Sequence, residues 1–539
     1  MPTHDTQRYT HDAIIVGGGH NGLVCAAYLA KAGLDVLVLE RRHVVGGACA
    51  TEEIFPGYHV STCSYVVYIL QDKIVEDLEL RKYGYDVHPL PMKRFFPFPD
   101  GRSLIFWNDT ARTCREIEAL FSAKDAQGYA QLQGFWYRAG SLFNRFFLAE
   151  PPTIAELQEL VRGTEDEALL DTLLHTTLSE LVDDLFESEE VKAAAVSHIM
   201  AAKGVDEPGL LFAYAATKPN ALTNPDNQGI AVGGMGGLSS AIARSAQAAG
   251  AKIRCGAEVK RVLLEEGRAV GVELCDGQII RSRIVISNAD PKRTFLHLVG
   301  AEHLEPAVAD SIRSLETACA TLKFHAIVDE LPDFSRYLGA DADPKLISTV
   351  GIGPTIGYYR KSIEDALAGR LTDCPVIDVQ IPTVYDTTIA PAGKHIVSMW
   401  VRFLPVHPAE GNWADLRERV GNQLIDLMTE YAPNFRDSLI DWLVYTPADI
   451  EQRLHITDGN FRHTDHTASQ LLAHRLFSRG GHRTPIPGLY MCGAGTHPGG
   501  DVSGAPGHNA AQRVLGDWGT AIRDWGLGIS DWEIGRLGD

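Results

Sequence analysis

The sequence lacks any close pairing of cysteines. Its nine cysteines are scattered over 539 residues, and no two of them are separated by only two positions. This spacing excludes a redox-active C-x-x-C dithiol and gives no support for a cysteine zinc site, and the odd number disfavours a disulfide-bonded scaffold. Irregularly spaced cysteines of this kind are usually reduced and mostly buried, and reduced thiols are typical of the cytoplasm, so we expect a cytoplasmic protein.

Positive charge and long apolar segments are also scarce. The 69 acidic residues outnumber the 49 lysines and arginines, which leaves a formal charge of −20. Phosphate backbones would repel a protein this acidic, so we expect no binding to nucleic acid. No segment approaches the roughly 18 consecutive apolar residues that a membrane-spanning helix requires, and residues 1–12 contain no apolar signal-peptide core. Peripheral contact with a membrane, through a local apolar patch, stays open.

Glycine is abundant, and the first glycine-rich segment follows an apolar strand. Residues 12–16 are typical of a buried parallel strand, and residues 17–22 read G-x-G-x-x-G. An alanine-rich helix is predicted over 23–31, and a second strand over 34–39 ends in Glu40. The complete order of strand, turn, helix, strand and acid within about 30 residues predicts a Rossmann-type dinucleotide-binding unit.

Each residue of this motif has a physical role in that interpretation. Gly17 permits the tight turn, Gly19 lets the backbone approach a pyrophosphate, and Gly22 permits close packing of the helix on the strand. The helix N-terminus presents free N–H groups to the phosphates. Glu40 stands where a carboxylate would accept hydrogen bonds from the ribose hydroxyls.

A second glycine pair, Gly46 and Gly47, comes six residues after Glu40. A nicotinamide dehydrogenase does not need it, whereas a longer cofactor does, so we expect FAD rather than NAD. The pattern E-x5-G-G resembles the FAD-binding motif of the phytoene desaturase and amine oxidase superfamily. That resemblance implies that Arg42 contacts the phosphates or a ribose.

A third glycine cluster lies near the other end of the chain. Residues 493–501 read GAGTHPGGD, and a helix is predicted over 505–515. Backbone that lies close to a flat ring needs glycine, and a helix N-terminus aimed at the flavin N1/O2 edge would stabilise the reduced ring. We therefore expect Gly493, Gly500 and Val502 to contact the cofactor.

The three motifs, together with residues 233–294, resemble the phytoene desaturase-like FAD oxidoreductases. Within this family the sequence is most similar to the subgroup of pyridine nucleotide-disulfide oxidoreductase domain-containing protein 2. The resemblance implies that the backbone at Val259 packs against the adenine. It also implies an α/β fold: a Rossmann-type FAD-binding domain of glutathione-reductase-like or amine-oxidase-like topology, with an interleaved α+β substrate domain.

The chain would then cross between the two domains several times. Only one dinucleotide-binding unit is found, which argues against a tightly bound NAD(P)H. We expect an FAD-binding domain made of residues 1–100, 231–300 and 456–515. The substrate domain would contain residues 101–230 and 301–455, and residues 516–539 would form a C-terminal tail.

Three other patterns allow a functional or a structural interpretation. The aromatic segment 129–148 could line a lipophilic substrate or touch a membrane, but a core helix is the simpler interpretation. The histidines between His455 and His474 suggest a metal, yet no partnering cysteine or second close pair supports one, so we expect no metal site. Asp-Trp pairs at 517, 524 and 531 suggest a tail packed on the body or on a second copy of the chain, so a homo-oligomer stays open.

The resemblance implies an FAD-dependent dehydrogenase or desaturase that transfers hydride from a lipophilic small molecule to flavin N5. His497 and Asp501 are the candidates for polar assistance, and Asp501 stands where the subgroup would have a third glycine. Two alternatives stay open: a flavin-dependent isomerase or saturase, and an interaction protein in which FAD is structural. The electron acceptor is also open among oxygen, a quinone and NAD(P).

Overall fold

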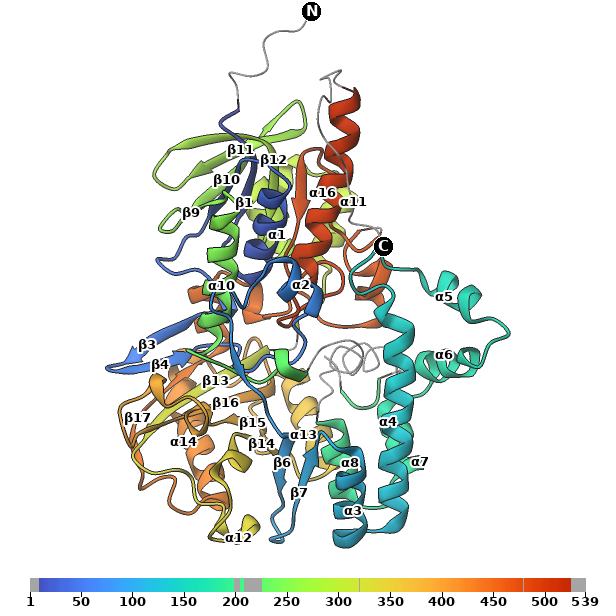
Figure 1. Ribbon diagram of the computed structural model, residues 1–539, viewed down its shortest axis with the longest axis vertical. Helices are drawn as coiled ribbons and strands as arrows, with labels where there is room; N and C mark the ends of the chain where they lie inside the picture. The colour runs from blue at the N-terminus through green and yellow to red at the C-terminus, as the bar shows by residue number, and fades with distance from the viewer. Residues whose placement is uncertain (1–8, 198–203, 208–224, 319, 478, 525–539) are drawn as a thin grey trace, which may run out of the picture.

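The computed structural model describes residues 9–197, 204–207, 225–318, 320–477 and 479–524. Two seven-stranded sheets lie one above the other in Figure 1, and a lobe of helices flanks the lower one. The fold is an α/β Rossmann-type architecture with a mixed second sheet, as the sequence predicts.

The first sheet contains the predicted dinucleotide-binding unit. Its parallel strands are β18, β12, β1, β2 and β9 in that order, and an antiparallel hairpin of β10 and β11 continues from β12. Some of the paired strands are far apart in sequence: β12 pairs with β1 on one side and with β18 on the other. The bounds are β1 (His11–Val16), β2 (Val36–Leu39), β9 (Lys252–Arg254), β10 (Val259–Glu265), β11 (Arg268–Leu274), β12 (Ile279–Ser287) and β18 (Leu489–Met491).

Three helices pack together beside this sheet. Helix α1 (His20–Lys31) contacts both α10 (Met235–Ala248) and α16 (Ala505–Asp524), and all three stand side by side in Figure 1. The helix α1 is rich in alanine and almost wholly buried, which lets the other helices approach closely. Glycines stand at the start of each of these helices: residues 17–22 at α1, residues 233–237 at α10 and residues 493–504 before α16.

The second sheet is mixed and has the order β17-β13-β16-β15-β14-β6-β7. Residues 320–328 pair with residues 395–404, which pair in turn with residues 376–380, so these three strands are neighbours within it. Its bounds are β6 (Met92–Pro97), β7 (Ser103–Trp107), β13 (Ala320–Val328), β14 (Thr349–Ile352), β15 (Val376–Gln380), β16 (His395–Leu404) and β17 (Leu439–Tyr445).

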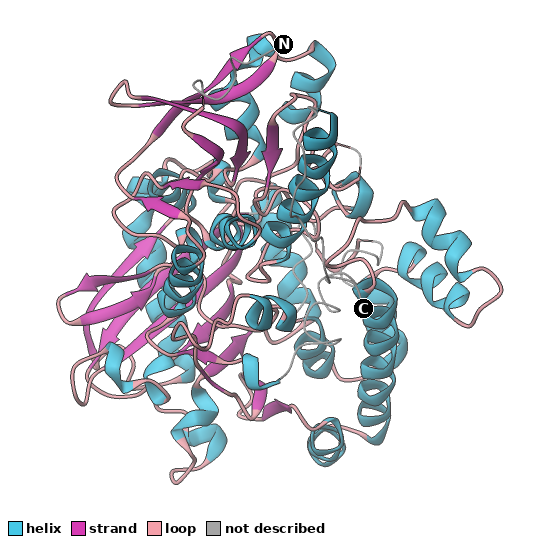
Figure 2. Ribbon diagram, turned by 45° about the horizontal axis from the view of Figure 1, so that its top comes forward, coloured by secondary structure: helices cyan, strands magenta, loops and turns pink. Residues whose placement is uncertain are grey.

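The remaining elements connect and cover the two sheets. Helices α3 to α8 form the lobe at the right of Figure 1, and α5 and α6 project from it in Figure 2. The strand pairs β3–β4 and β5–β8 lie outside the main sheets. The bounds are α2 (Asp72–Asp77), α3 (Thr110–Leu120), α4 (Ala123–Asn144), α5 (Ile154–Val161), α6 (Asp166–His175), α7 (Leu178–Leu185), α8 (Glu189–Val196), α11 (Pro306–Arg313), α12 (Ser335–Leu338), α13 (Ile356–Leu367), α14 (Trp413–Tyr431), α15 (Pro447–Leu454), β3 (Thr51–Phe55), β4 (Tyr58–Ser61), β5 (Val87–His88) and β8 (Ile230–Ala231).

One predicted domain boundary needs correction. The sequence predicts that residues 1–100 belong to the cofactor domain, but β6 pairs with β7 and β14 in the second sheet. The chain therefore leaves the first domain before Met92. The sequence does not show where the chain passes to the second domain, because an aromatic strand with prolines could belong to either sheet.

The tail begins as an extension of α16. The carboxylate of Asp517 accepts hydrogen bonds from Arg483 Nε at 3.0 Å and from Tyr490 Oη at 2.9 Å, so this part packs on the body of the molecule. The Asp-Trp positions beyond Asp524 lie outside the described residues.

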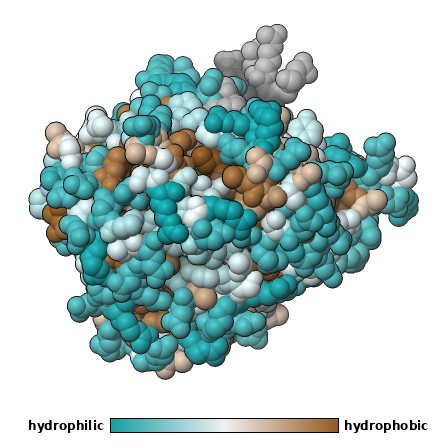
Figure 3. All heavy atoms as spheres, turned by 90° about the horizontal axis from the view of Figure 1, so that it is seen from below, coloured by the Kyte–Doolittle hydropathy of each residue, from teal (hydrophilic) through white to brown (hydrophobic). Residues whose placement is uncertain are grey.

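No helix among the described residues is both long enough and apolar enough to cross a membrane. The face seen from below is mostly hydrophilic, with a band of apolar residues in the upper half of the view and smaller apolar patches elsewhere (Figure 3).

Candidate functional site

The first glycine turn has the geometry that its motif predicts. Gly17 has a φ of +98°, and its amide donates to the carbonyl oxygen of Leu39 at 2.8 Å, which ties the turn to the end of β2. A Cβ at Gly22 would lie 2.4 Å from the carbonyl oxygen of Gly17. Only glycine at position 22 therefore lets α1 start this close to the turn.

Glu40 is buried at the end of β2 and faces the same turn. Its Oε2 accepts from the amide of Gly18 and its Oε1 accepts from the amide of Arg42, each at 2.8 Å. A carboxylate oxygen has more than one acceptor site, so both oxygens can still accept hydroxyl groups. The carboxylate is fixed in place before any ligand binds.

The second glycine pair lies directly against the first turn. Gly19 and Gly46 form a parallel bridge, and the amide of Gly46 donates to the carbonyl oxygen of Gly18 at 2.8 Å. Gly46 and Gly47 both have positive φ, and a Cβ at Gly47 would lie 3.3 Å from the Cα of Gly19. The two predicted phosphate-binding segments thus form one continuous backbone surface.

Arg42 is partly satisfied within the protein. One guanidinium nitrogen forms an ion pair with Glu52, whereas its Nη1 is buried without a hydrogen-bond partner. A buried donor that lacks a partner costs about 1–3 kcal/mol. An anionic or hydroxyl oxygen of a ligand would satisfy it, so Arg42 fits the predicted contact with a dinucleotide.

Val259 begins β10 close to this end of the sheet. Two residues earlier, Ala257 donates its amide to the carbonyl oxygen of Glu40, and Gly256 donates to that of Arg42, each at 2.9 Å. These bonds hold residues 256–259 beside the acid that would hold the ribose. The neighbourhood is the one that adenine contact at Val259 requires.

The third glycine cluster is also explained by packing within the protein. A Cβ at Gly493 would lie 2.7 Å from the carbonyl oxygen of Asn288, and a Cβ at Gly500 would lie 2.8 Å from the Cα of Arg462. These two glycines are therefore required whether or not a ring lies beside them. Val502, next to them, is nearly buried and lines a cavity.

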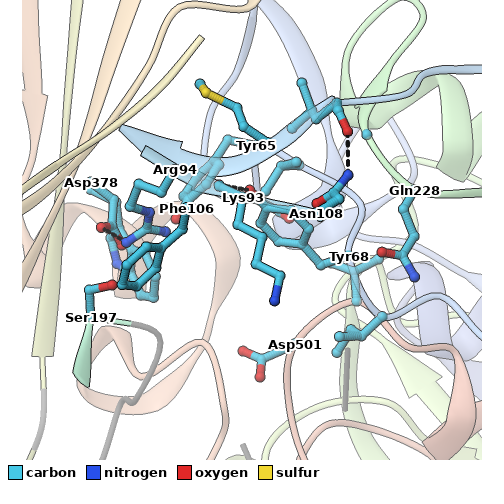
Figure 4. Close-up of a pocket in the computed structure, with 18 of the residues that line it drawn as sticks. Tyr65, Tyr68, Lys93, Arg94, Phe106, Asn108, Ser197, Gln228, Asp378 and Asp501 are labelled. Atoms are coloured by element: carbon cyan, nitrogen blue, oxygen red, sulfur yellow. Dashed lines mark hydrogen bonds and ion pairs between the residues drawn. The ribbon is translucent and has the colours of Figure 1, made fainter. Parts of the chain in front are cut away.

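That cavity has a volume of about 820 Å³ and lies between the glycine segments and the second sheet. Its lining includes His20, Ala48, Ala494, Asp501 and Val502, which belong to the three glycine-bearing segments. Much of the rest is apolar or aromatic and comes from β6, β7, α4 and β16, including Met92, Phe106, Leu132, Trp136 and Trp400. Figure 4 shows Asp501 at one side of this space and Arg94 with Asp378 at another.

The aromatic segment 129–148 serves both interpretations. Tyr129, Trp136 and Tyr137 on α4 line the cavity. Tyr129 and Trp136 also belong, with Phe143 and Phe147, to the buried core of the helical lobe. The core and pocket interpretations therefore overlap within this segment.

The two catalytic candidates have different surroundings. Asp501 lines the cavity, has a φ of +71°, and places its Oδ1 3.3 Å from Arg462 Nε. A positive φ favours glycine, which explains why a glycine is expected at this position, and aspartate tolerates it better than most residues. His497 is buried away from the cavity lining, and its Nε2 lies 2.6 Å from the carbonyl oxygen of Phe146. Because a carbonyl can only accept, Nε2 carries the proton, and the arrangement is that of a structural histidine.

His20, at the start of α1, is the cavity histidine that the sequence did not single out. Its Nδ1 lies 3.4 Å from the Sγ of Cys49, and burial lowers its pKa to about 4. The ring is therefore neutral at pH 7 and does not add charge to the cavity.

Comparison with known proteins agrees with this geometry. Residues 15–73 match the family model described as an NAD(P)-binding Rossmann-like domain. The chain is 35% identical to the "Pyridine nucleotide-disulfide oxidoreductase domain-containing protein 2" of Rattus norvegicus over 94% of both chains. The chain belongs to the phytoene desaturase-like family of FAD oxidoreductases.

Two further relatives have names that specify a reaction. The chain is 28% identical to one of the limonene dehydrogenase polypeptides of Castellaniella defragrans, over 95% of both chains. It is 25% identical to the lycopene-forming phytoene desaturase of Pseudescherichia vulneris, over 91% of this chain and 96% of that one.

Solved structures share the fold of this family member at low identity. An oxidoreductase from Methanosarcina mazei aligns with a TM-score of 0.58 and 19% identity, over 94% of this chain and all of the other. Putrescine oxidase bound to putrescine aligns with a TM-score of 0.53 and 14% identity, over 95% and 99% of the two chains. The amine-oxidase-like topology predicted from the sequence is thereby confirmed.

Asn288 is a residue of this family member that sequence reasoning missed. It follows β12, and its Nδ2 donates to the carbonyl oxygen of Gly17 at 3.3 Å and would lie 2.8 Å from a Cβ at Gly19. It ties the third strand of the unit to the glycine turn. The asparagine directly after a predicted buried strand, in the run Ser287-Asn288-Ala289-Asp290, was the available signal.

A second missed group lies on the other wall of the cavity. Lys323, Arg94, Asp378 and Arg402 come from four strands of the second sheet, and all four are at most 4% exposed. Charged residues within apolar strands could have been noticed, but their meeting depends on strand order that the sequence does not show.

The histidines of residues 455–474 are the ones that suggested a metal in the sequence. Among the described residues, no three His, Cys, Asp or Glu side chains are grouped so that they could hold an ion. Burial lowers the pKa of His463 to about 4, which is the behaviour of a neutral, packed ring.

Proposed function

We propose that the protein is an FAD-dependent oxidoreductase that dehydrogenates a lipophilic small molecule. The carrying observation is the cavity: residues of all three glycine-bearing segments line one part of it, and apolar side chains line much of the rest. A cofactor held along those segments would reach the space in which an apolar substrate fits.

Bound FAD supplies an acceptor for hydride at its N5 atom. The chain's own residues bind and orient it. Glu40 offers free acceptor sites to ribose hydroxyls, and Arg42 offers an unpaired N–H to an anionic oxygen. The apolar walls exclude water and hold the substrate C–H bond in one orientation.

We assign to Asp501 the role of the base that accepts a proton from the substrate. In a dehydrogenation, one carbon loses hydride to the cofactor, its neighbour loses a proton, and a C=C bond forms between them. The carboxylate of Asp501 lines the cavity, and Arg462 holds it in position. It can therefore accept the proton that the substrate releases. Relatives named for limonene dehydrogenase and for phytoene desaturase support this reaction type.

The test begins with the protein as purified. We expect it to contain flavin, and we expect an apolar substrate to bleach that flavin under anaerobic conditions. In Asp501→Asn the flavin content should be unchanged, whereas the rate of bleaching should fall by about 100-fold. The matched control is Asp310→Asn, which removes a surface carboxylate and should leave the rate unchanged.

Other outcomes decide against parts of the proposal. A protein that binds no flavin excludes the cofactor, and a flavin that no apolar compound reduces excludes dehydrogenation. Product formation that requires reduced flavin but no net electron acceptor would indicate an isomerase. Reoxidation of the bleached flavin by oxygen, a quinone or NAD(P)+, each added alone, identifies the electron acceptor.

A further inference from the structure

One wall of the cavity carries an unusual row of buried side chains. Lys323 on β13 lies opposite Trp400 on β16, and Trp400 lies opposite Asp378 on β15. Directly opposite residues of neighbouring strands share a face of the sheet. All three line the cavity, so this face of the second sheet is its wall.

Two arginines join the row from neighbouring positions. Arg402 is two residues from Trp400 on the same strand and therefore shares its face. Arg94 reaches Asp378 from β6, crossing Gly351 on β14, where a Cβ would lie 2.8 Å from the Cδ of Arg94. The glycine at 351 gives the arginine its path to Asp378.

The charges in this group do not balance. Asp378 Oδ1 accepts from Arg94 Nη1 and, at 3.3 Å, from Arg402 Nη2, so two guanidinium groups share one carboxylate. The Nε atoms of both arginines are buried without a hydrogen-bond partner. The three groups together therefore keep a net positive charge.

Lys323 adds a second uncompensated charge. It is 1% exposed, and its Nζ has no hydrogen-bond partner. The Nζ lies 4.5 Å from the centre of the Tyr65 ring, a contact that compensates an ammonium group only in part. Burial lowers the pKa of Lys323 to about 8, so at pH 7 the side chain is still mostly protonated.

A third cation enters the same space. The ammonium group of Lys93 extends into the cavity in Figure 4 and donates to Gln133 Oε1 at 3.1 Å. Among the described lining residues, the acidic side chains are Asp378 and Asp501, and Arg462 contacts Asp501. Buried charge is costly unless a partner compensates it. Since no further acid lines this space among the described residues, an anionic ligand would compensate the charge.

We propose that the substrate is a lipophilic molecule with an anionic oxygen head group, a carboxylate or a phosphate, which binds between Lys323 and the Arg94–Arg402–Asp378 group. The apolar walls from α4 and β6 hold its body. Charge-assisted hydrogen bonds from an ammonium and a guanidinium group are strong in a dry site, and they fix which end of a long molecule lies at this wall. This inference rests on the proposed function, because it names the substrate class of the same cavity.

The test compares four probes with the same alkyl chain on the flavin-containing protein: dodecanoate, dodecyl phosphate, dodecanol and dodecylamine. Binding is measured by isothermal calorimetry at concentrations below micelle formation. We expect at least one anion to bind about tenfold or more tightly than dodecanol, and dodecylamine to bind most weakly. The better of the two anions identifies the head group.

Variants then assign the preference to this wall. Lys323→Met should weaken binding of the preferred anion by about tenfold, which is about 1.4 kcal/mol, and leave dodecanol within about twofold. Lys82→Met, which removes a charge at the exposed surface, should change neither. If Lys323→Met does not fold, the order of the four probes on the unmodified protein still decides.

The inference is overturned if dodecanol binds as tightly as both anions, or if Lys323→Met weakens all probes equally. Failure of the proposed function looks different. In that case the anions bind selectively, but no apolar compound bleaches the flavin.

Discussion

The glycine segments and the cationic wall formed by Lys323, Arg94 and Arg402 are the two sides of one cavity. They differ in whether their polar groups have hydrogen-bond partners within the protein. At the glycine turn, the polar groups of Glu40, Gly18 and Gly46 are joined by hydrogen bonds within the protein. At the wall, Lys323 and the Nε atoms of two arginines are buried without partners. The first region is preorganised backbone, and the second is unsatisfied side-chain charge. The glycine side therefore has its geometry fixed before a ligand binds, whereas the wall has buried positive charge that an anionic ligand would compensate.

The largest expected effect is loss of bound flavin when the glycine turn is disrupted. Gly22→Ala places a Cβ 2.4 Å from the carbonyl oxygen of Gly17, so α1 must move away from the turn. We expect nearly complete loss of bound flavin, measured as the ratio of flavin to protein absorbance. Gly134→Ala is the control, because nothing lies within 4 Å of a Cβ at that position. Retention of flavin in Gly22→Ala would contradict the packing argument.

The second effect concerns the carboxylate that the two arginines share. Asp378→Asn leaves both guanidinium groups buried without a counter-charge, which should lower the free energy of unfolding by about 4 kcal/mol. Urea titration measures the loss. Combining it with Arg402→Met removes one of the two cations and should recover part of the stability. A double variant no more stable than the single one would show that Asp378 acts by other means.

The third effect goes in the stabilising direction. Lys323→Met removes a buried ammonium group whose pKa falls from 10.5 to about 8, a shift that corresponds to about 3 kcal/mol. Between pH 8 and 10.5 the unfolded chain binds a proton that the folded chain releases, so stability rises with pH across this window. Below pH 8 the full cost is present.

We therefore expect Lys323→Met to be more stable than the unmodified protein at pH 7, and the gain to shrink as the pH approaches 10.5. Urea titrations at several pH values measure both. A gain that does not depend on pH would mean that packing, and not charge, is responsible.

The smallest effect on stability is expected at Asp501, which lies in the third glycine segment and lines the cavity. Asp501→Gly relieves a φ of +71° and should stabilise the fold by about 1 kcal/mol, less the lost contact with Arg462. Asp501→Asn should change stability less, since asparagine also tolerates this conformation. Thermal unfolding of both variants measures the difference. A less stable glycine variant would show that the contact with Arg462 outweighs the strain.

The two regions also differ in what the sequence could predict. The strand, turn, helix and acid around Gly17 to Glu40 are contiguous, so spacing alone predicted their contacts. The wall is made by β6, β13, β15 and β16, whose neighbours follow from strand order. Lys323 lies on β13, which is inside the sheet, and every residue of that strand is buried.

Two predictions about the glycine segments were incomplete for a related reason. Gly493 and Gly500 were expected to lie against the flavin, yet protein atoms already require them to be glycine. His497 was grouped with Asp501 by its position in the sequence, while the fold turns it to the carbonyl of Phe146. Proximity in sequence does not give the direction of a side chain in an irregular turn.

The pairing of β18 with β12 has a consequence for synthesis of the chain. The strand β12 ends at Ser287, but β18 begins only at Leu489. While the ribosome makes the intervening residues, the edge of β12 has no neighbour on that side, and unpaired strand edges invite pairing with other chains. The nascent protein is thus exposed to misassembly until β18 emerges, and we expect a truncated product that lacks β18 to aggregate more readily than the full chain.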